Sequence, residues 1–228
     1  MKTPLVLLGA GDHARDVLAI AADCAAAGGF DYELLGCLVD AQYGVAGTVI
    51  DGLPILGEPS WLADHAGRVH AFCAVGASSL RLRFSRLCDR YGVRAATIVH
   101  PTAYIGPDVV LGEGVMVAAR CVLTRRVTVG AHTQINVGCV LTHGNRLAEL
   151  VTLSPGVLLA GNVTVDTGCF MGIGASVIQG RRIGAWSTVG AGCTVICDVP
   201  ANATVVGVPG RTIETKTAGW QEIAPVDW

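Results

Sequence analysis

Two histidines in the second half of the chain, His132 and His143, have side chains suited to proton transfer, because an unperturbed imidazole has a pKa of about 6.5. Each stands within a regular six-residue repeat, at a place where the chain is expected to turn a corner and direct its side chains outward. No motif supports such a role for His132, which we expect to be a surface residue. A single outward histidine is most often only a solvated side chain. Its chemistry therefore depends on the elements that hold it.

The repeat extends from Ile105 to Val195, and every sixth residue in this range is aliphatic or methionine. Four positions after the aliphatic residue, small or β-branched residues recur, among them Cys121, Cys139, Cys169 and Cys193. A fixed short period of this kind is typical of a β-solenoid, whose stacked coils turn the aliphatic series into one internal column. Neither helical spacing nor strand alternation keeps a six-residue phase over this length.

The first hundred residues follow another pattern, in which short apolar segments alternate with helical ones. We expect strands at 5–8, 34–40, 70–75 and 93–99, helices at 16–27, 60–65 and 79–91, and a turn at 54–57. Such alternation predicts a small parallel sheet with crossover helices. The boundary falls near His100-Pro101, since a proline disfavours helix at the residue before it.

The composition narrows the class of protein. Of the 228 residues, 51% are hydrophobic and 15% charged, with a net charge of −2. This charge disfavours nucleic acid and anionic membranes as partners, and no sustained apolar stretch predicts membrane insertion. The start of the chain shows no signal segment, so we expect a cytoplasmic protein. Nine cysteines without C-x-x-C spacing argue against disulfides and against a metal site.

Several motifs in order along the chain carry a resemblance to a known family. They are Gly9-Ala10-Gly11-Asp12-His13, the acid Asp40 at the end of the second expected strand, His100-Pro101, and the segments AGNVTV, GASVI, VGAGCTVICDVP and GVPGR. Over residues 4–211 the chain resembles the sugar acyltransferases of the left-handed β-helix superfamily. More narrowly, it resembles the nucleotide-linked amino-sugar N-acetyltransferases and the sialic acid O-acetyltransferases.

The resemblance implies the fold and the partners. The expected fold is a small α/β, Rossmann-like domain at residues 1–98, which binds the nucleotide sugar, followed by an all-β left-handed parallel β-helix at 99–213, the acetyltransferase domain. A tail at 214–228 shows no period, and either docking on a neighbouring subunit or disorder is open. The family forms homotrimers with about three hexads per coil, and acetyl-CoA lies between neighbouring solenoids.

The resemblance also implies site residues. His143 matches the catalytic histidine, a general base that takes a proton from the acceptor. Gly161 lies eighteen residues, or one coil, further on, and its backbone N–H would stabilise the oxyanion. Asn136 would orient the acceptor. The remaining acetyl-CoA contacts are expected from Gly190, Ala191, Gly192, Gly207, Val208, Pro209 and Arg211. Nucleotide-sugar contacts are expected from Gly9, Gly11, Asp12, His13, Asp40, Gly76 and Arg81.

The chain departs from the family pattern around the histidine. The family carries an acid directly after it and often one before it, whereas this chain has Gly144 and Thr142. Thr152 replaces a second histidine. The far nitrogen of His143 must then be held by a backbone carbonyl, by Asn145 or by a residue of an adjacent subunit. In the N-terminal motif, Asp12 replaces a glycine and places a negative charge near the expected diphosphate.

The sequence therefore predicts an acetyl-CoA-dependent N-acetyltransferase acting on a nucleotide-linked amino sugar in surface glycan synthesis. One alternative is O-acetylation of a sugar hydroxyl, as in sialic acid modification. Another is a catalytically silent, trimeric sugar-nucleotide-binding protein, which the missing acids beside His143 would suit.

Overall fold

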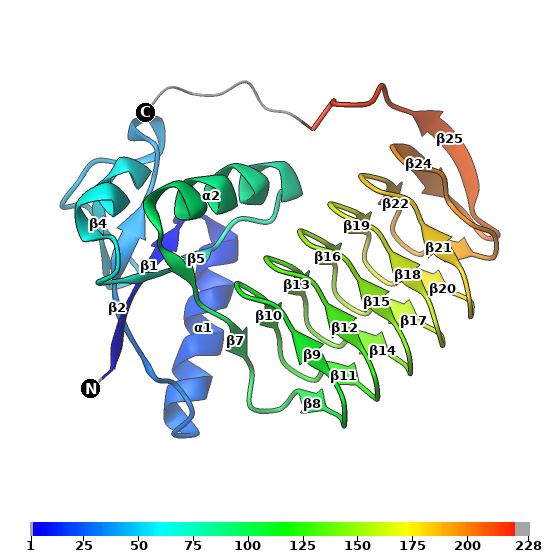
Figure 1. Ribbon diagram of the computed structural model, residues 1–228, viewed down its shortest axis with the longest axis horizontal. Coiled ribbons are helices and arrows are strands. Elements are labelled where there is room, and N and C mark those ends of the chain that lie inside the picture. The colour runs from blue at the N-terminus through cyan, green and yellow to red at the C-terminus, as the bar shows by residue number, and fades with distance from the viewer. Residues whose placement is uncertain (1, 222–228) are drawn as a thin grey trace. The chain divides into compact units, whose positions relative to one another are not determined.

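The computed structural model describes residues 2–221. The chain divides into two compact units, with the division between Ile98 and Val99. The first is an α/β unit and the second is a solenoid of short strands, as Figure 1 shows.

The first unit contains a six-stranded sheet and two α-helices. In chain order its elements are β1 (Thr3–Leu8), α1 (Asp12–Ala26), β2 (Tyr32–Leu38), the 3-10 helix η1 (Ala41–Tyr43), β3 (Val49–Ile50), β4 (Leu53–Gly57), the 3-10 helix η2 (Pro59–His65), β5 (His70–Cys73), α2 (Ser78–Tyr91) and β6 (Arg94–Ala95). The strand order is β3-β4-β2-β1-β5-β6, and all neighbours except β3 and β4 are parallel. The chain leaves β1 toward β2 and returns on its other side as β5. Such a reversal opens a crevice at the carboxyl ends of the strands.

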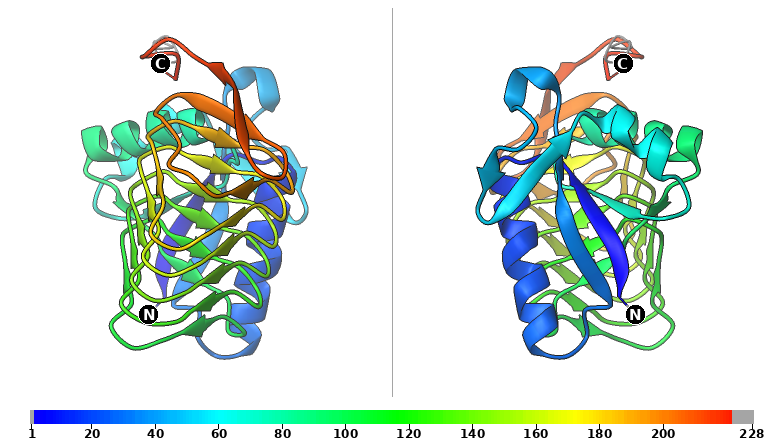
Figure 2. Two further views of the ribbon diagram at one scale, coloured as in Figure 1. Left: turned by 90° about the vertical axis from the view of Figure 1, so that its right-hand side faces the viewer. Right: turned by 90° about the vertical axis from the view of Figure 1, so that its left-hand side faces the viewer.

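Side-chain alternation along β1 explains why both faces of this sheet are covered. Val6 and Leu8 share a buried cluster with Phe84 and Leu87 of α2. Successive strand residues point to opposite faces, so the equally buried Leu5 and Leu7 project to the other side. Helices α1 and α2 accordingly lie on opposite faces of the sheet (Figure 2, right).

Strand β4 corrects the sequence analysis, which placed a turn at residues 54–57. Residues 53–57 form a strand that pairs with β2 in parallel and with β3 in antiparallel orientation. The proline misled the prediction. Pro54 lies opposite Val49 of the short strand β3, near the edge of the sheet, where a missing N–H is tolerated.

The second unit is built from three sheets of parallel strands that recur every eighteen residues, except that the last two strands of the first sheet depart from this spacing and pair with each other in antiparallel orientation. The first sheet contains β7 (Ile98–Val99), β10 (Met116–Val117), β13 (Gln134–Ile135), β16 (Thr152–Leu153), β19 (Phe170–Met171), β22 (Thr188–Val189), β24 (Ala203–Val206) and β25 (Arg211–Thr215). The second contains β8 (Tyr104–Ile105), β11 (Val122–Leu123), β14 (Val140–Leu141), β17 (Leu158–Leu159), β20 (Ser176–Val177) and β23 (Thr194–Val195). The third contains β9 (Val110–Leu111), β12 (Thr128–Val129), β15 (Arg146–Leu147), β18 (Thr164–Val165) and β21 (Arg182–Ile183).

The register confirms the hexad prediction. Leu123 of β11 pairs with Leu141 of β14, which pairs with Leu159 of β17, and all three are buried. The aliphatic residue of each hexad is thus the second residue of its strand and points into the core. The left panel of Figure 2 looks along this stack from its last coil. The fold is the expected Rossmann-like unit followed by a left-handed parallel β-helix.

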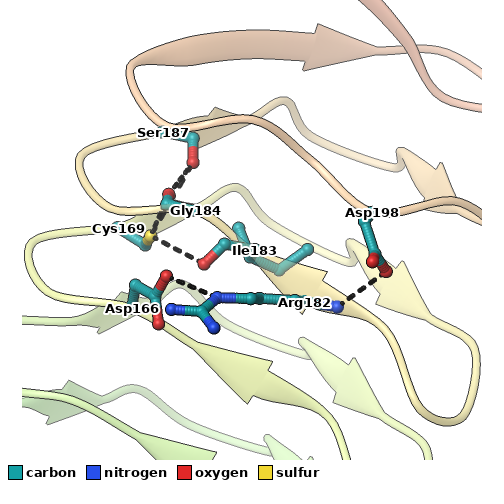
Figure 3. Close-up of polar contacts among 7 residues, drawn as sticks. All are labelled: Asp166, Cys169, Arg182, Ile183, Gly184, Ser187 and Asp198. Atoms are coloured by element: carbon teal, nitrogen blue, oxygen red, sulfur yellow. Dashed lines mark hydrogen bonds and ion pairs between the residues drawn. The ribbon is translucent and has the colours of Figure 1, made fainter.

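Buried thiols and hydroxyls in the small-residue positions of the repeat form hydrogen bonds between one coil and the next. The Cys169 thiol donates to the carbonyl oxygens of Gly184, at 3.0 Å, and of Ile183, at 3.8 Å (Figure 3). Burial raises the pKa of Cys169 to about 11, so the thiol stays protonated at neutral pH. Cys121 and Cys139 donate in the same way to the carbonyls of Asn136, at 3.0 Å, and Ser154, at 3.2 Å, so these three cysteines are more than small apolar fillers.

The described part of the tail closes the last coil. Strand β25 pairs with β24 in antiparallel orientation, and the Lys216 N–H then donates to the Asn202 carbonyl at 2.9 Å. The Trp220 indole donates to the Asn202 side chain at 3.2 Å, and the rings of Trp220 and Trp186 form a T-shaped pair with their centroids 6.5 Å apart. This strap covers a solenoid edge that would otherwise be open. Residues 222–228 of the predicted tail lie outside the described residues.

Along residues 2–221, the helices are too short or too polar to cross a membrane.

Candidate active site

His143 lies at the solvent-exposed corner between β14 and β15, as the repeat predicts. The next coil passes directly over it, and the Asn162 N–H donates to the His143 carbonyl at 2.9 Å. The imidazole lies against the Cα of Gly161. A Cβ built on that glycine would be 2.7 Å from Nε2 and still closer to Cε1. The structure therefore brings His143 and Gly161 together.

The contact gives Gly161 a packing role that the sequence analysis did not predict. The imidazole occupies the space in which a Cβ at position 161 would lie, and Gly161 is buried. Its carbonyl accepts from the Gly180 N–H at 2.9 Å. The glycine thus makes room for the imidazole of His143. Stabilisation of an oxyanion by its N–H stays a prediction.

A polar depression of about 540 Å³ opens beside the imidazole. It is lined by Asp108, Arg126, Thr128, His143, Gly144, Arg146, Asn162 and Thr164. Asp108 forms an ion pair with Arg125 at 3.5 Å. The depression could hold the polar part of an acyl acceptor within reach of the histidine.

Asn145 does not hold the far nitrogen of His143, which was one of the possibilities. Its side chain is fully buried inside the solenoid. There Oδ1 accepts from the Val163 N–H at 2.8 Å, and Nδ2 donates to the Leu159 carbonyl at 3.4 Å. These two groups lie two residues on either side of Gly161, so Asn145 fixes the segment that covers the imidazole. Within residues 2–221, the His143 ring itself makes no hydrogen bond or ion pair.

Asn162 occupies the space beside Gly144. Its Oδ1 lies where a Cβ of Gly144 would be, and both residues have positive φ, 58° and 73°. The position after the histidine therefore has no room for an acidic side chain while Asn162 is present.

Asn136 lies at a different corner from His143. It follows β13, and its Nδ2 donates to the Leu153 carbonyl at 2.8 Å. Strand β14 separates the two corners, so one protomer does not bring Asn136 and His143 together.

The other residues predicted to bind acetyl-CoA gather at the last coils, several turns from His143. Gly190, Ala191 and Gly192 follow β22, and Gly207, Val208, Pro209 and Arg211 lie between and within β24 and β25. The Gly190 N–H donates to Val205 at 2.8 Å and the Thr194 N–H to Gly207 at 3.1 Å, which joins the two segments. Val208 is 73% exposed, and Arg211 is exposed.

A second cavity, of about 490 Å³, lies at the carboxyl ends of β1 and β5 in the first unit. Its lining is Gly9, Ala10, Gly11, Val39, Asp40, Gln42, Tyr43, Val75, Leu80, Arg83 and Phe84. Gly9 has φ +108°, and a Cβ there would lie 2.7 Å from Val75, so this turn requires glycine. The structure thus brings together Gly9, Gly11 and Asp40.

Arg83, which was not predicted from the sequence, pairs with Asp40 in the lining of this cavity. The guanidinium donates to both carboxylate oxygens, at 3.3 and 3.4 Å, and the two side chains are only 15% and 16% exposed. Leu80 and Phe84 flank Arg83 on α2 at helical spacing. Because Leu80, Arg83 and Phe84 have i, i+3, i+4 spacing, they share one face of the helix. An arginine on the apolar face of a helix, together with the acid Asp40 at the end of a strand, was the signal in the sequence that could have identified the pair.

Arg81 and Gly76 stand behind the cavity rather than in its lining. Arg81 is fully buried, and its guanidinium donates to the carbonyls of Gly76 at 2.7 Å and Val75 at 3.2 Å. Burial lowers the pKa of Arg81 to about 10, which leaves it charged at neutral pH. Arg81 therefore shapes the turn after β5 instead of offering a free cation to a ligand.

Asp12 and His13 begin α1 and also lie outside the lining. The Asp12 carboxylate is exposed and forms an ion pair with Arg15, which also bonds Asp51 at 2.6 Å. Arg15 is thus shared by two carboxylates, and the three side chains together keep one negative charge. His13 is partly buried. Across residues 2–221, no cluster of three or more His, Cys, Asp or Glu side chains is placed to hold a metal ion.

Comparisons with known proteins agree with this architecture. The sequence profile of the PglD N-terminal domain matches residues 4–87. PerB from Caulobacter crescentus, solved in complex with CoA and GDP-perosamine, is 31% identical with a TM-score of 0.84, over 92% of this chain and 97% of PerB. The acetyltransferase domain of PglB from Neisseria gonorrhoeae, solved with acetyl coenzyme A, is 26% identical with a TM-score of 0.82, over 93% and 100% of the two chains.

A GDP-perosamine N-acetyltransferase of Escherichia coli O157:H7 is 26% identical over 218 residues, or 91% of this chain and 95% of that enzyme. The fold and these matches define a hexapeptide-repeat acyltransferase. Within that class, the chain belongs to the sugar N-acetyltransferase family, as the resemblance implied.

Proposed function

We propose that this protein transfers the acetyl group of acetyl-CoA to the amino group of a nucleotide-linked amino sugar used in surface glycan synthesis. The observation that carries the proposal is the contact of the His143 ring with Gly161 beside a polar depression. The relatives that match nearly the whole chain add support, since PerB was solved with CoA and GDP-perosamine. GDP-perosamine is therefore the first acceptor to test.

His143 acts as the general base in this proposal. The neutral amine attacks the thioester carbonyl carbon, a C–N bond forms and the C–S bond breaks. The proton lost by nitrogen passes to the imidazole and then to the departing sulfur, so the products are the amide and CoA as a thiol. A base of this kind contributes roughly 10²–10⁴ in rate. The Gly161 N–H is proposed as the donor to the carbonyl oxygen in the transition state.

The active unit is proposed to be a homotrimer in the cytoplasm. Asn136 and His143 lie at different corners of one protomer, so they can share a site only if a second copy supplies one of them. An apolar groove of about 370 Å³ begins beside Thr142 and is lined by Leu158 and Ile178, which are 48% and 37% exposed. Such a surface suits contact with a neighbouring solenoid and with the pantetheine arm of CoA.

A panel of acceptors tests the function. We expect CoA release from acetyl-CoA with GDP-perosamine or another nucleotide-linked amino sugar, and a mass gain of one acetyl group on the amine. Free amino sugars and sialic acids should react far more slowly, because they lack the nucleotide. Release of CoA only with a sugar hydroxyl would favour O-acetylation, and no binding of acetyl-CoA at millimolar concentration would favour the catalytically silent protein.

A further inference from the structure

The arginines near His143 differ in how their charges are balanced. Five lie along the corner and sheet that carry His143: Arg125, Arg126, Arg146, Arg181 and Arg182. Three of them have carboxylate partners, which are Asp108 for Arg125 at 3.5 Å, Asp198 for Arg181 at 3.7 Å and Asp166 for Arg182 at 2.9 Å. Among the described residues, the side chains of Arg126 and Arg146 have no such partner. These two are also the arginines that line the depression beside His143.

The register of the solenoid explains why Arg146 is unbalanced. Arg146 of β15 aligns with Thr164 of β18 and Arg182 of β21, so the two arginines share one column. Arg182 receives its carboxylate from Asp166, sixteen residues earlier (Figure 3). The residue sixteen positions before Arg146 is Gly130. The charge of Arg182, two coils away from Arg146, is thus balanced by a carboxylate, whereas the charge of Arg146, beside the histidine, is not.

Two uncompensated guanidinium groups in one depression form a site for an anion. A guanidinium presents several N–H donors in a planar fork that matches phosphate oxygens. Close positive charges without a counter-charge raise the local concentration of anions. Asp108 also lines the depression, but its carboxylate is paired with Arg125. Phosphate is the anion common to both substrates of the proposed reaction.

We propose that Arg126 and Arg146 form a phosphate-binding subsite that positions a substrate at His143. The subsite is separate from the glycine turn between β1 and α1, where a diphosphate was also expected. The inference rests on the proposed function for the identity of the substrate. The phosphate belongs either to the nucleotide-linked acceptor or to acetyl-CoA, and the two sources are separated by experiment.

The test replaces both arginines by methionine, which keeps most of the apolar stem. We expect the Michaelis constant of one substrate to rise about tenfold in the double variant, since charge-assisted hydrogen bonds at a partly exposed site are worth this much in sum. A rise for the acceptor alone assigns the subsite to its diphosphate, and a rise for acetyl-CoA alone assigns it to CoA. Arg126→Lys and Arg146→Lys together should recover part of the loss.

Arg182→Met is the matched control, because Arg182 lies in the same column with its charge already paired. It should leave both Michaelis constants unchanged. The wild-type constant should also rise with added salt, and the double variant should show a weaker dependence, because screening acts on the same charges.

Calorimetric titration with GDP and with CoA tests the subsite without turnover. A loss of affinity for either ligand in the double variant supports the subsite even if no acceptor is acetylated, so a failure of the proposed function remains distinguishable. Unchanged Michaelis constants and affinities would overturn the proposal. So would a change in molar mass by light scattering without any change in ligand affinity, since the arginines would then pair with a second copy of the chain.

Discussion

At the scale of single residues, the site depends on the packing of the His143 ring against Gly161, which has no side chain. The ring fills the volume in which any other residue at position 161 would place its Cβ. Two residues that seem independent in the sequence are therefore one packing unit. Their orientation follows from the eighteen-residue register, which stacks position 161 on position 143.

Gly161→Ala should displace the imidazole and lower kcat. The new Cβ overlaps Cε1 and Nε2, and overpacking of this kind costs roughly 1–3 kcal/mol. We expect the free energy of unfolding, measured in urea, to fall by this amount. In the background of His143→Ala the space is empty, so the same substitution should cost far less. Equal costs in both backgrounds would show that ring and glycine are not coupled.

At the scale of elements, the coils are joined by buried polar side chains as well as by the strand ladders. Asn145 interrupts an inward column whose neighbours one coil away are Val127 and Val163. It is the inward residue at the corner of His143 and bonds on both sides of Gly161. Thr133 bridges coils in a comparable way at another corner, donating to Ala148 at 3.0 Å and accepting from Val151 at 3.2 Å.

Asn145→Val should lower kcat as well as the free energy of unfolding. Valine is accommodated one coil before and after, but the Val163 N–H loses its acceptor, which costs roughly 1–3 kcal/mol. The segment over the imidazole then loosens, so we expect kcat to fall several-fold. Thr133→Val is the control and should reduce stability by a similar amount with kcat unchanged. If both variants lost activity equally, Asn145 would contribute only to folding.

At the scale of the whole molecule, the sequence predicted the parts that depend on periodicity. The hexads predicted the inward column, the coil length placed Gly161 over His143, and the strand–helix alternation predicted the sheet of the first unit. The comparisons confirm the family, the acetyl-CoA co-substrate and the class of enzyme. The predictions of the fold depend on patterns repeated many times, so that single exceptions do not obscure them, whereas the family, the co-substrate and the enzyme class followed from the resemblance.

The parts that were missed depend on single residues and their partners. Strand β4 was not predicted because it contains Pro54. Arg83 was not recognised because its role depends on Asp40, which is distant in the sequence. Arg81 was expected at the ligand, but packing against β5 buries it. Asn145 was considered as a partner for the His143 ring at the outer surface, although its position in the repeat directs its side chain inward. The roles of His143 and of the residues around it stay predictions until activity is measured.

Steady-state turnover of His143→Ala, at saturating acetyl-CoA and acceptor, tests the central claim most directly. The control is His132→Asn, which replaces the other corner histidine by a residue that tolerates its φ of 56°. If His143 is the general base, kcat should fall by roughly 10²–10⁴ in His143→Ala and stay unchanged in the control. A kcat close to that of the wild type in His143→Ala would contradict the account.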